Sequence, residues 1–529
     1  MSFVDLTHFI PTFRSPRIHT NQLVVICLVC LADASLDTLR PSDLLSRLHW
    51  NSRPKTFPTK SGLAKTLHHH LRTRDSRSPT IPRIYPAKFA NMPTRDEISY
   101  FGAGPAPLPT PVIEASAAAL INFEDTGLGL SEISHRSPTA NKVLADAKQA
   151  LATLYEFDLD EYDVLFMQGG GTGEFSASVQ NCVGWWVERR RRAALKDLGE
   201  GKDGEVVERV RKEIKEELKV DYLVTGSWSL KASQEASRLI GGRYINVAVD
   251  ARKVNGGKFG VIPEEKDWSL SDSKKSAMTY WCDNETVDGV EFPKYPESLK
   301  GRGEDDGVVV ADMSSNFVSR KVNVRDYGVI FGGAQKNLGI AGITVIIVKK
   351  SLMALTPSAA FLQQLSDVLP SAITPIVFDF ATIAKNNSLY NTLPIFNLYV
   401  ATLVLQSLVS TFEEKKVGGQ EELANRKAQL VYEVLDKYSD VYHVVPDKSI
   451  RSRMNICFRI KPKADSGAEP GKWDETREKA FLAGAEKQNL MGLKGHRSVG
   501  GMRASNYNAV TLVSAQKLVA YMVQFAATS

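Results

Sequence analysis

The fold is decided by residues 307–349, which include Gly-Val-Val-Val-Ala-Asp-Met-Ser-Ser at 307–315 and Val-Ile-Phe-Gly-Gly-Ala-Gln-Lys-Asn-Leu-Gly at 329–339. Two apolar runs in this stretch, 308–311 and 329–331, are typical of buried parallel strands. The first ends at Asp312, and the second leads into a small-residue turn that carries Lys336. Because ligands of α/β sheets bind at the carboxyl ends of the strands, we predict that Asp312 and Lys336 share one site.

This acid and this lysine are the pair that pyridoxal phosphate chemistry requires. A lysine forms the Schiff base with that cofactor, and a carboxylate keeps its pyridine nitrogen protonated, so that the ring withdraws electrons. A Gly-Gly-x-x-Lys turn near an aspartate also occurs in solvated loops, so the pair by itself is a hypothesis.

A second glycine-rich turn follows the apolar run 163–167. It reads Gln-Gly-Gly-Gly-Thr-Gly-Glu-Phe at 168–175, and we expect a helix from about Ser176. Glycines let backbone N–H groups approach an anion, and a helix N-terminus adds a favourable partial charge. The turn therefore predicts a phosphate site. Its spacing is not G-x-G-x-x-G, which weakens the dinucleotide alternative, and no Walker A loop is present.

Two further apolar runs end in polar or aromatic residues. Run 222–227 ends at Trp228, and run 278–282 is followed by Asp-Asn-Glu-Thr-Val-Asp-Gly at 283–289. An aromatic side chain at a strand tip can lie flat on a planar cofactor, although an isolated tryptophan is more often a core residue. Strands that alternate with helical patterns predict an α/β sheet.

Together the motifs resemble the phosphoserine aminotransferase family of class-V pyridoxal phosphate enzymes, from about Tyr100 to the C-terminus. They are Gly-Gly-Gly-Thr-Gly-Glu-Phe at 169–175, Asn-Glu-Thr-Val-Asp-Gly at 284–289, Ala-Asp-Met-Ser-Ser at 311–315, Gly-Ala-Gln-Lys-Asn at 333–337, Tyr-Asn-Thr-Leu-Pro at 390–394 and Lys-Gly-His-Arg-Ser-Val-Gly-Gly-Met-Arg-Ala-Ser-Asn-Tyr-Asn at 494–508. They stand in the order in which that family carries them.

The resemblance implies a set of cofactor contacts. Lys336 would hold the cofactor and move the substrate proton, and Asp312 would pair with the pyridine nitrogen. The ring would stack on Trp228, with Thr286 near its phenolic oxygen. The phosphate would be bound by the backbone of Gly171 and Thr172, by Gln335, and by Asn391 and Thr392 of a second subunit.

The resemblance also implies the substrate contacts. Arg503 would bind the α-carboxylate, because a planar guanidinium matches a planar anion. The substrate phosphate, or the side-chain carboxylate of glutamate, would be bound by His135, Arg136, His496 and Arg497. Without the family, either His-Arg dipeptide is more typical of surface charge. Bacterial members often carry arginine where Thr172 stands, so this chain lacks one phosphate contact.

The implied fold is α/β, of fold type I. A large domain at 96–415 would hold a mostly parallel seven-stranded sheet, a smaller α/β domain at 416–529 would follow, and 96–109 would join the two by a strand. Residues 451–460 alternate like a half-buried strand, and 508–526 are typical of a closing amphipathic helix. The active sites would lie at the interface of a homodimer.

The implied reaction moves the amino group of glutamate to 3-phosphohydroxypyruvate, giving O-phospho-L-serine and 2-oxoglutarate in serine biosynthesis. Other enzymes of this fold remain alternatives. A cysteine desulfurase needs a nucleophilic cysteine on a mobile loop, and no cysteine has a matching context. Intact Lys336 and Asp312 argue against a non-catalytic metabolite-binding relative.

A basic leader, predicted to be disordered, precedes the enzyme at 1–95. Its first 91 residues hold 13 Lys and Arg against 5 Asp and Glu, a net charge of +8 in a chain whose total is +6. Its apolar run, 23–32, is too short to span a bilayer. A mitochondrial-type presequence, a disordered extension and translation upstream of the true start all remain open. We favour initiation at Met92, because 92–105 resembles the usual beginning of the family.

Scattered cysteines and one charged insertion complete the sequence. Five cysteines form no disulfide pattern, and Cys27-Leu-Val-Cys30 lacks partner ligands, so we expect a cytoplasmic protein without a metal site. Residues 186–220 are charged, with apolar residues at helical spacing, which predicts one or two solvent-facing helices joined at 199–204. Acids interleave with the four arginines at 189–192, so nucleic-acid binding is not expected.

Overall fold

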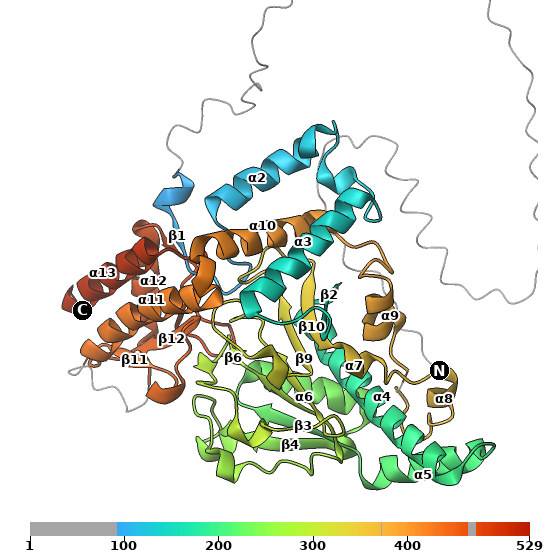
Figure 1. Ribbon diagram of the computed structural model, residues 1–529. Coiled ribbons are helices and arrows are strands. Elements are labelled where there is room, and N and C mark those ends of the chain that lie inside the picture. Colours follow the sequence, from blue (N-terminus) through green and yellow to red (C-terminus); the bar gives the residue numbers. More distant parts are fainter. Residues whose placement is uncertain (1–92, 372, 464–471, 529) are drawn as a thin grey trace, which may run out of the picture. The chain divides into compact units, whose positions relative to one another are not determined.

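A seven-stranded sheet forms the centre of the chain (Figure 1), whose computed structural model describes residues 93–371, 373–463 and 472–528. In spatial order the strands are β2 (Tyr162–Met167), β10 (Thr344–Lys349), β9 (Val329–Gly333), β8 (Val308–Asp312), β5 (Ser276–Cys282), β3 (Lys219–Val224) and β4 (Ile245–Asp250). Of these strands only β10 is antiparallel, to both β2 and β9. The predicted mostly parallel α/β sheet is confirmed.

Helices cover both faces of this sheet, which explains why β8 and β9 are buried along their whole length. One face is covered by α3 (Pro138–Tyr155) and α10 (Ile395–Phe412), and α2 (Thr110–Ile121) packs on the outer side of α10. The other is covered by α4 (Gly170–Leu198), α5 (Asp203–Glu216), α6 (Ser227–Ile240), α8 (Ala359–Gln363) and α9 (Phe380–Lys385), with the short α7 (Lys350–Met353) after β10. The result is a three-layer arrangement.

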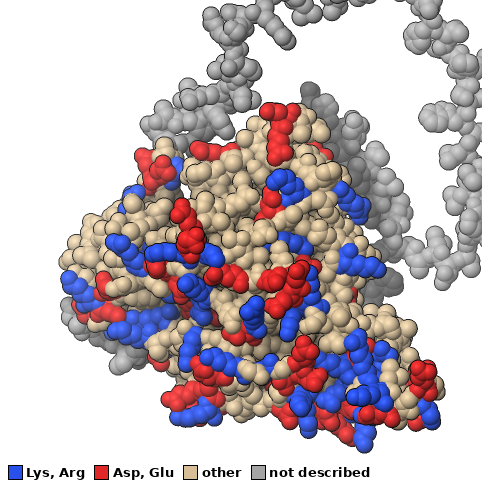
Figure 2. Space-filling view, in the orientation of Figure 1, with Lys and Arg blue, Asp and Glu red and all other residues tan. Residues whose placement is uncertain are grey.

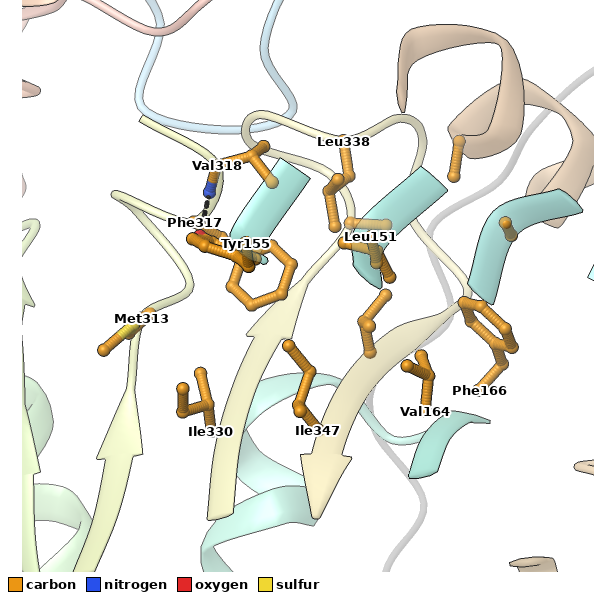
Figure 3. Close-up of a cluster of buried hydrophobic side chains, with 14 of the residues drawn as sticks. Leu151, Tyr155, Val164, Phe166, Met313, Phe317, Val318, Ile330, Leu338 and Ile347 are labelled. Atoms are coloured by element: carbon orange, nitrogen blue, oxygen red, sulfur yellow. Dashed lines mark hydrogen bonds between the residues drawn. The ribbon is translucent and has the colours of Figure 1, made fainter. Parts of the chain in front are cut away.

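Figure 3 shows the core beneath α3, where Leu151 and Tyr155 pack on side chains of β2, β9 and β10. The hydroxyl oxygen of Tyr155 accepts a hydrogen bond of 2.5 Å from the backbone N–H of Val318. Val318 has a φ of +49°, which a β-branched residue rarely adopts. The core therefore fixes the backbone shortly after Asp312, the residue at the end of β8.

The C-terminal part contains a smaller antiparallel sheet of β11 (Tyr442–Val444), β12 (Asn455–Ile460) and β14 (Met502–Ser505). It packs with α11 (Val417–Lys437), α12 (Glu475–Lys487) and α13 (Leu512–Thr528) around its own apolar cluster. Next to it, β1 (Ser99–Tyr100) pairs in parallel with β13 (Leu490–Met491). The segment after β1 reaches the central sheet, where Ala106 N–H donates to the carbonyl of Gln335 at 2.9 Å.

Several predicted boundaries were wrong. Helix α4 begins at Gly170 rather than near Ser176, because the glycines form its first turn. Strand β12 begins at Asn455 rather than at 451, because Ser452 and Arg453 bond to Asn284 and Glu291, which follow β5. The strand is also almost wholly buried rather than half-buried. Helix α13 begins at Leu512 rather than 508, because Asn508 is held by Asn337 and Val318.

The predicted charged insertion consists of the end of α4 and the whole of α5, joined by a turn at 199–202. Its apolar residues are buried against α4, as expected: Val206, Val207, Val210 and Ile214. On the outside, Arg209 bonds to Asp197 and Glu213 at 2.9 and 3.0 Å. Figure 2 shows both signs of charge interleaved over this corner of the molecule.

Among the described residues, one helical stretch, Ile395–Lys415, is long and apolar enough to cross a membrane. It contains α10, which lies in the core beside α3; the Thr402 hydroxyl donates to the carbonyls of Leu398 at 2.9 Å and Val143 at 3.4 Å. Its apolar composition is therefore explained by packing. The predicted disordered leader and its Cys27–Cys30 pair lie outside the described residues, except for 93–95.

Candidate active site

Lys336 and Asp312 lie at the carboxyl ends of the neighbouring strands β9 and β8, as predicted. Lys336 Nζ donates to Thr286 Oγ1 at 3.0 Å. The buried Asp312 carboxylate accepts at Oδ1 from Ser314 N–H at 2.8 Å and from the Ser314 hydroxyl at 2.5 Å. Burial raises the pKa of Asp312, while Lys336 and the two Ser314 bonds act against this shift. Its Oδ2 atom remains directed toward the start of α4.

Thr286 joins Lys336 to Arg503. Its hydroxyl accepts from Lys336, and its backbone carbonyl accepts from Arg503 Nη1 at 3.1 Å. Arg503 belongs to β14 of the C-terminal sheet, so the site combines both parts of the chain. The Nε atom of Arg503 is buried without a hydrogen-bond partner. One N–H of the guanidinium fork is thus available to an anionic ligand.

The glycine-rich turn places the N-terminus of α4 beside Asp312. Gly169 and Gly170 have φ values of +122° and +63°, which favour glycine. A Cβ atom on Gly171 would lie 3.8 Å from Asp312 Oδ2 and from Ser314 Oγ. The first N–H groups of a helix lack partners within it, so those of Gly171 and Thr172 are free to bind an anion. The Gln335 side chain folds against Gly333 at the same edge.

Trp228 is the second residue of α6, and its ring faces two lysines. Lys231 Nζ lies 4.2 Å and Lys336 Nζ 6.0 Å from the ring centroid. The indole Nε1 atom is buried without a hydrogen-bond partner. The ring is thus close enough to Lys336 to stack on a planar group bound there.

Of the C-terminal His-Arg pair, His496 lines a cleft of about 760 Å³ whose lining also includes Arg503, Ser227 and Asp288. His496 Nδ1 lies 2.6 Å from Ser498 Oγ. Burial lowers the pKa of His496, and the nearby cations Arg503, Lys231 and Arg497 lower it further. The Arg497 side chain is exposed.

The other predicted ligands lie near residues 389–392 and the beginning of the glycine-rich turn. Arg136 Nη2 donates to the Leu389 carbonyl at 3.4 Å, and Asn391 Nδ2 donates to Gln168 Oε1 at 2.6 Å. Thr392 is exposed beside them, and His135 Nε2 is buried without a partner. Among the described residues, no hydrogen bond or ion pair joins either member of the 135–136 pair to the 496–497 pair. The union of the two His-Arg pairs in one site is therefore still a prediction.

Four charged residues near the site were missed as candidates from the sequence. Glu285 and Asp288 bind the start of α6, and Lys231 lies over Trp228. Glu174, in the first turns of α4, is fully buried with both carboxylate oxygens unpartnered, and burial raises its pKa to about 8. Three of the four stand inside motifs that we quoted, but nothing in those motifs shows which charges are buried.

The described cysteines do not support thiolate chemistry. Cys182, Cys282 and Cys457 are free and buried. Burial raises the pKa of all three thiols, to about 12 for Cys457. A desulfurase needs an accessible thiolate, so this alternative loses support. Within the described ranges there is also no group of three or more His, Cys, Asp or Glu suited to a metal ion.

Known proteins are similar to this chain in sequence and in fold. A family model described as aminotransferase class-V matches residues 205–469. The phosphoserine aminotransferase of Saccharomyces cerevisiae is 42% identical over 435 residues, covering 82% of this chain and 98% of that protein. The solved phosphoserine aminotransferase from Bacillus circulans subsp. alkalophilus superposes with a TM-score of 0.64 at 32% identity, over 81% of this chain and 98% of that one.

The pyridoxal-phosphate-bound phosphoserine aminotransferase from Trichomonas vaginalis gives a TM-score of 0.63 at 30% identity, over 80% of this chain and 99% of that one. These similarities extend over nearly the full length of the relatives. The chain therefore belongs to the class-V aminotransferases and, within them, to the phosphoserine aminotransferase family.

Proposed function

We propose that this chain is a pyridoxal-phosphate-dependent enzyme that transfers the amino group of glutamate to 3-phosphohydroxypyruvate. The products are O-phospho-L-serine and 2-oxoglutarate, and the pathway is serine biosynthesis. The observation that carries the proposal is the link through Thr286, which holds Lys336 at 3.0 Å and Arg503 at 3.1 Å from its two oxygens. An amine and a carboxylate-binding fork at this separation are what an amino-acid transaminase needs.

The residues present fit pyridoxal phosphate. The indole Nε1 of Trp228 and Nε of Arg503 are buried donors without partners, and the Trp228 ring centroid lies 6.0 Å from Lys336 Nζ. Asp312 Oδ2 would accept a hydrogen bond from the protonated pyridine nitrogen. Gly171, Thr172 and Gln335 would bind the phosphate, with Thr286 near the phenolic oxygen. When bound, the cofactor supplies an electron-withdrawing ring that stabilises negative charge at the substrate Cα.

The chain's own groups divide the remaining work. Lys336 moves the proton at the substrate Cα, and Thr286 holds the lysine within reach of it. Arg503 binds the α-carboxylate and orients the Cα–H bond, which lowers the barrier by fixing the geometry. His496 and Arg497 bind the far anionic group, which is a phosphate in one half-reaction and a carboxylate in the other. One cationic site can serve both half-reactions because each substrate carries a second anionic group besides its α-carboxylate.

The same proposal includes a homodimer. Arg136 bonds to the carbonyl of Leu389, which places it near Asn391 and Thr392. Exposed apolar side chains stand near these segments in the sequence: Leu120, Ile121, Leu128 and Tyr390. We propose that a second copy covers these segments and that His135, Arg136, Asn391 and Thr392 reach the partner's cofactor phosphate and substrate. A division into domains at 96–415 and 416–529 and a cytoplasmic location belong to the same proposal.

The test is an assay of the purified protein with glutamate and either 3-phosphohydroxypyruvate or unphosphorylated hydroxypyruvate. We expect formation of 2-oxoglutarate with a strong preference, in kcat/KM, for the phosphorylated keto acid. Equal use of the two keto acids would reduce the assignment to an unspecified aminotransferase. Lys336→Ala is the control and should abolish turnover with both.

A further inference from the structure

Two buried carboxylates hold the start of α6. Asp288 Oδ2 accepts from Ser227 N–H at 2.7 Å, and Glu285 Oε2 accepts from Trp228 N–H at 2.8 Å. Glu285 Oε1 accepts from Ser229 N–H at 2.9 Å and from the Ser229 hydroxyl at 2.5 Å. The first three N–H groups of the helix are therefore all bound by side chains of one turn, residues 284–289.

This contact is tight and shielded from water. Glu285 and Asp288 are 0% and 6% exposed. A Cβ atom on Gly226 would lie 2.3 Å from Glu285 Cγ, so the helix start and the carboxylate touch without room for a side chain. Burying two acids is costly unless hydrogen bonds and positive potential compensate. The helix N-terminus supplies both.

The same turn carries Thr286 between the two acids. It is itself anchored, since Asn284 Nδ2 donates to Ser315 Oγ at 2.7 Å and to Asn455 Oδ1 at 2.8 Å. A single short turn thus bonds to Trp228 through its acids and to Lys336 and Arg503 through Thr286. Any tilt of α6 relative to this turn would move the indole relative to the lysine.

We propose that Glu285 and Asp288 are positioning residues that fix the plane of Trp228 against the cofactor ring. They do so by binding the backbone N–H groups of Ser227, Trp228 and Ser229. Because Thr286 belongs to the same turn as the two acids, this turn holds both the start of α6 and Lys336. The inference rests on the proposed function, because it takes pyridoxal phosphate as the group on which Trp228 stacks. A helix cap with no effect on Trp228 is the competing interpretation.

The experiment compares Glu285→Gln and Asp288→Asn with Glu188→Gln. Each change replaces one carboxylate oxygen, which accepts hydrogen bonds, by an NH2 group, which donates them, at nearly constant side-chain volume. Glu188 is the matched control, because it is also buried and hydrogen-bonded, to Arg191 and Arg192, but lies at the far end of α4. The readouts are the affinity of the apoprotein for pyridoxal phosphate by titration, the visible circular dichroism of the bound cofactor, and hydrogen exchange of residues 227–229 in the apoprotein.

We expect Glu285→Gln and Asp288→Asn each to weaken cofactor binding about tenfold and to reduce the dichroism, whereas Glu188→Gln changes only thermal stability. In a Trp228→Ala background the same two changes should weaken binding less than about twofold, because the ring they position is gone. Equal losses with and without Trp228 would overturn the proposal.

Hydrogen exchange separates this inference from the proposed function. Faster exchange at 227–229 in both variants, in the absence of cofactor, is expected if the carboxylates hold the helix start. Unchanged exchange would overturn the inference even if the enzyme is an aminotransferase. If wild-type apoprotein bound no pyridoxal phosphate, the proposed function would fail, and with it the cofactor role of the two acids, while faster exchange would still show that they hold α6.

Discussion

At the scale of single residues, the hydrogen-bond donors around a buried acid oppose the effect of burial on its pKa. Asp312 has two hydrogen bonds from Ser314 and a lysine nearby, and these oppose the effect of burial on its pKa. Glu174, fully buried on α4, has no hydrogen-bond partner at either oxygen. Burial raises the pKa of both acids, but hydrogen bonds oppose this shift at Asp312 and not at Glu174.

Glu174→Gln should make the stability of the protein less dependent on pH. Burial raises the pKa of Glu174 from 4.5 to about 8. Between these values the folded chain keeps a proton that the unfolded chain has released, so stability falls as pH rises, by at most about 1.4 kcal/mol per pH unit. Urea unfolding at pH 5, 6, 7 and 8 measures the slope. The variant should be more stable at pH 8, and an unchanged slope would show that Glu174 is ionised in the folded state.

Arg497→Ala and Arg503→Ala should separate phosphate recognition from carboxylate recognition. Arg503 serves the α-carboxylate that all substrates share, so its loss should reduce kcat/KM for every substrate. If the bound phosphate pairs with Arg497 and excludes water from it, loss of Arg497 should reduce kcat/KM for 3-phosphohydroxypyruvate by a factor equivalent to about 2–5 kcal/mol and affect hydroxypyruvate much less. Cofactor absorption should be unchanged in Arg497→Ala. Equal losses for both keto acids in that variant would place the phosphate elsewhere.

At the scale of elements, two helix N-termini point toward the same site and are used differently. The start of α4 is glycine-rich and leaves its first N–H groups free, whereas the start of α6 is bound by Glu285 and Asp288. A helix N-terminus attracts anions in either case. Only α4 is left to bind a phosphate, and α6 instead carries Trp228.

A buried lysine on α11 fixes the loop that follows β14. Lys427 Nζ donates to the carbonyls of Val510 at 2.7 Å, Tyr507 at 3.0 Å and Asn506 at 3.4 Å. Lys427→Met should leave these carbonyls unsatisfied and lower the free energy of unfolding by about 1–3 kcal/mol. Urea unfolding measures the loss, and hydrogen exchange should increase at 506–510. The exposed Lys437 on the same helix is the control, and equal effects of Lys437→Met would refute the role of Lys427.

At the scale of the whole molecule, the site depends on distant parts of the chain. Thr286 follows the central sheet and Arg503 belongs to the C-terminal sheet, yet the two are joined by a hydrogen bond of 3.1 Å. Arg136 lies near Leu389. In our proposal a second copy of the chain completes the substrate site with His135 and Arg136.

Subunit complementation tests this arrangement. Lys336→Ala and Arg136→Ala should each be nearly inactive alone. If Arg136 serves the partner's site, a mixed dimer has one intact site, and random mixing should recover about a quarter of wild-type activity. Refolding the two variants together and assaying the mixture measures this recovery. No recovery, with dimers present by light scattering, would mean that Arg136 acts within its own chain.

Removal of residues 1–91 should leave activity and stability unchanged, because the segment has little apolar content with which to pack. This segment lies outside the described residues, and its role is still a prediction. Thermal melts and kinetics of the full chain and of the form beginning at Met92 decide it. A clear loss in the shorter form would show that the leader contributes to the enzyme.

The sequence by itself determined the elements and the reactive pair. Apolar runs at 308–311 and 329–331 predict strands, because buried parallel strands need continuous hydrophobic residues, and the structure has β8 and β9 there. Asp312 and Lys336 follow from their positions at the ends of these strands. The family motifs also stand in contiguous segments. These features each lie within a short contiguous segment, so they can be predicted from the sequence without the structure.

Only the tertiary structure decided which charges are buried and which segments meet. Nothing local shows that Glu285 and Asp288 bind α6, a contact between residues about sixty positions apart in the sequence. Nor does the helical pattern from 508 reveal that Asn508 is held by Asn337 and that α13 starts at Leu512. Hydrogen bonds between distant segments set these features, because burial and charge depend on neighbours that the order of residues does not specify.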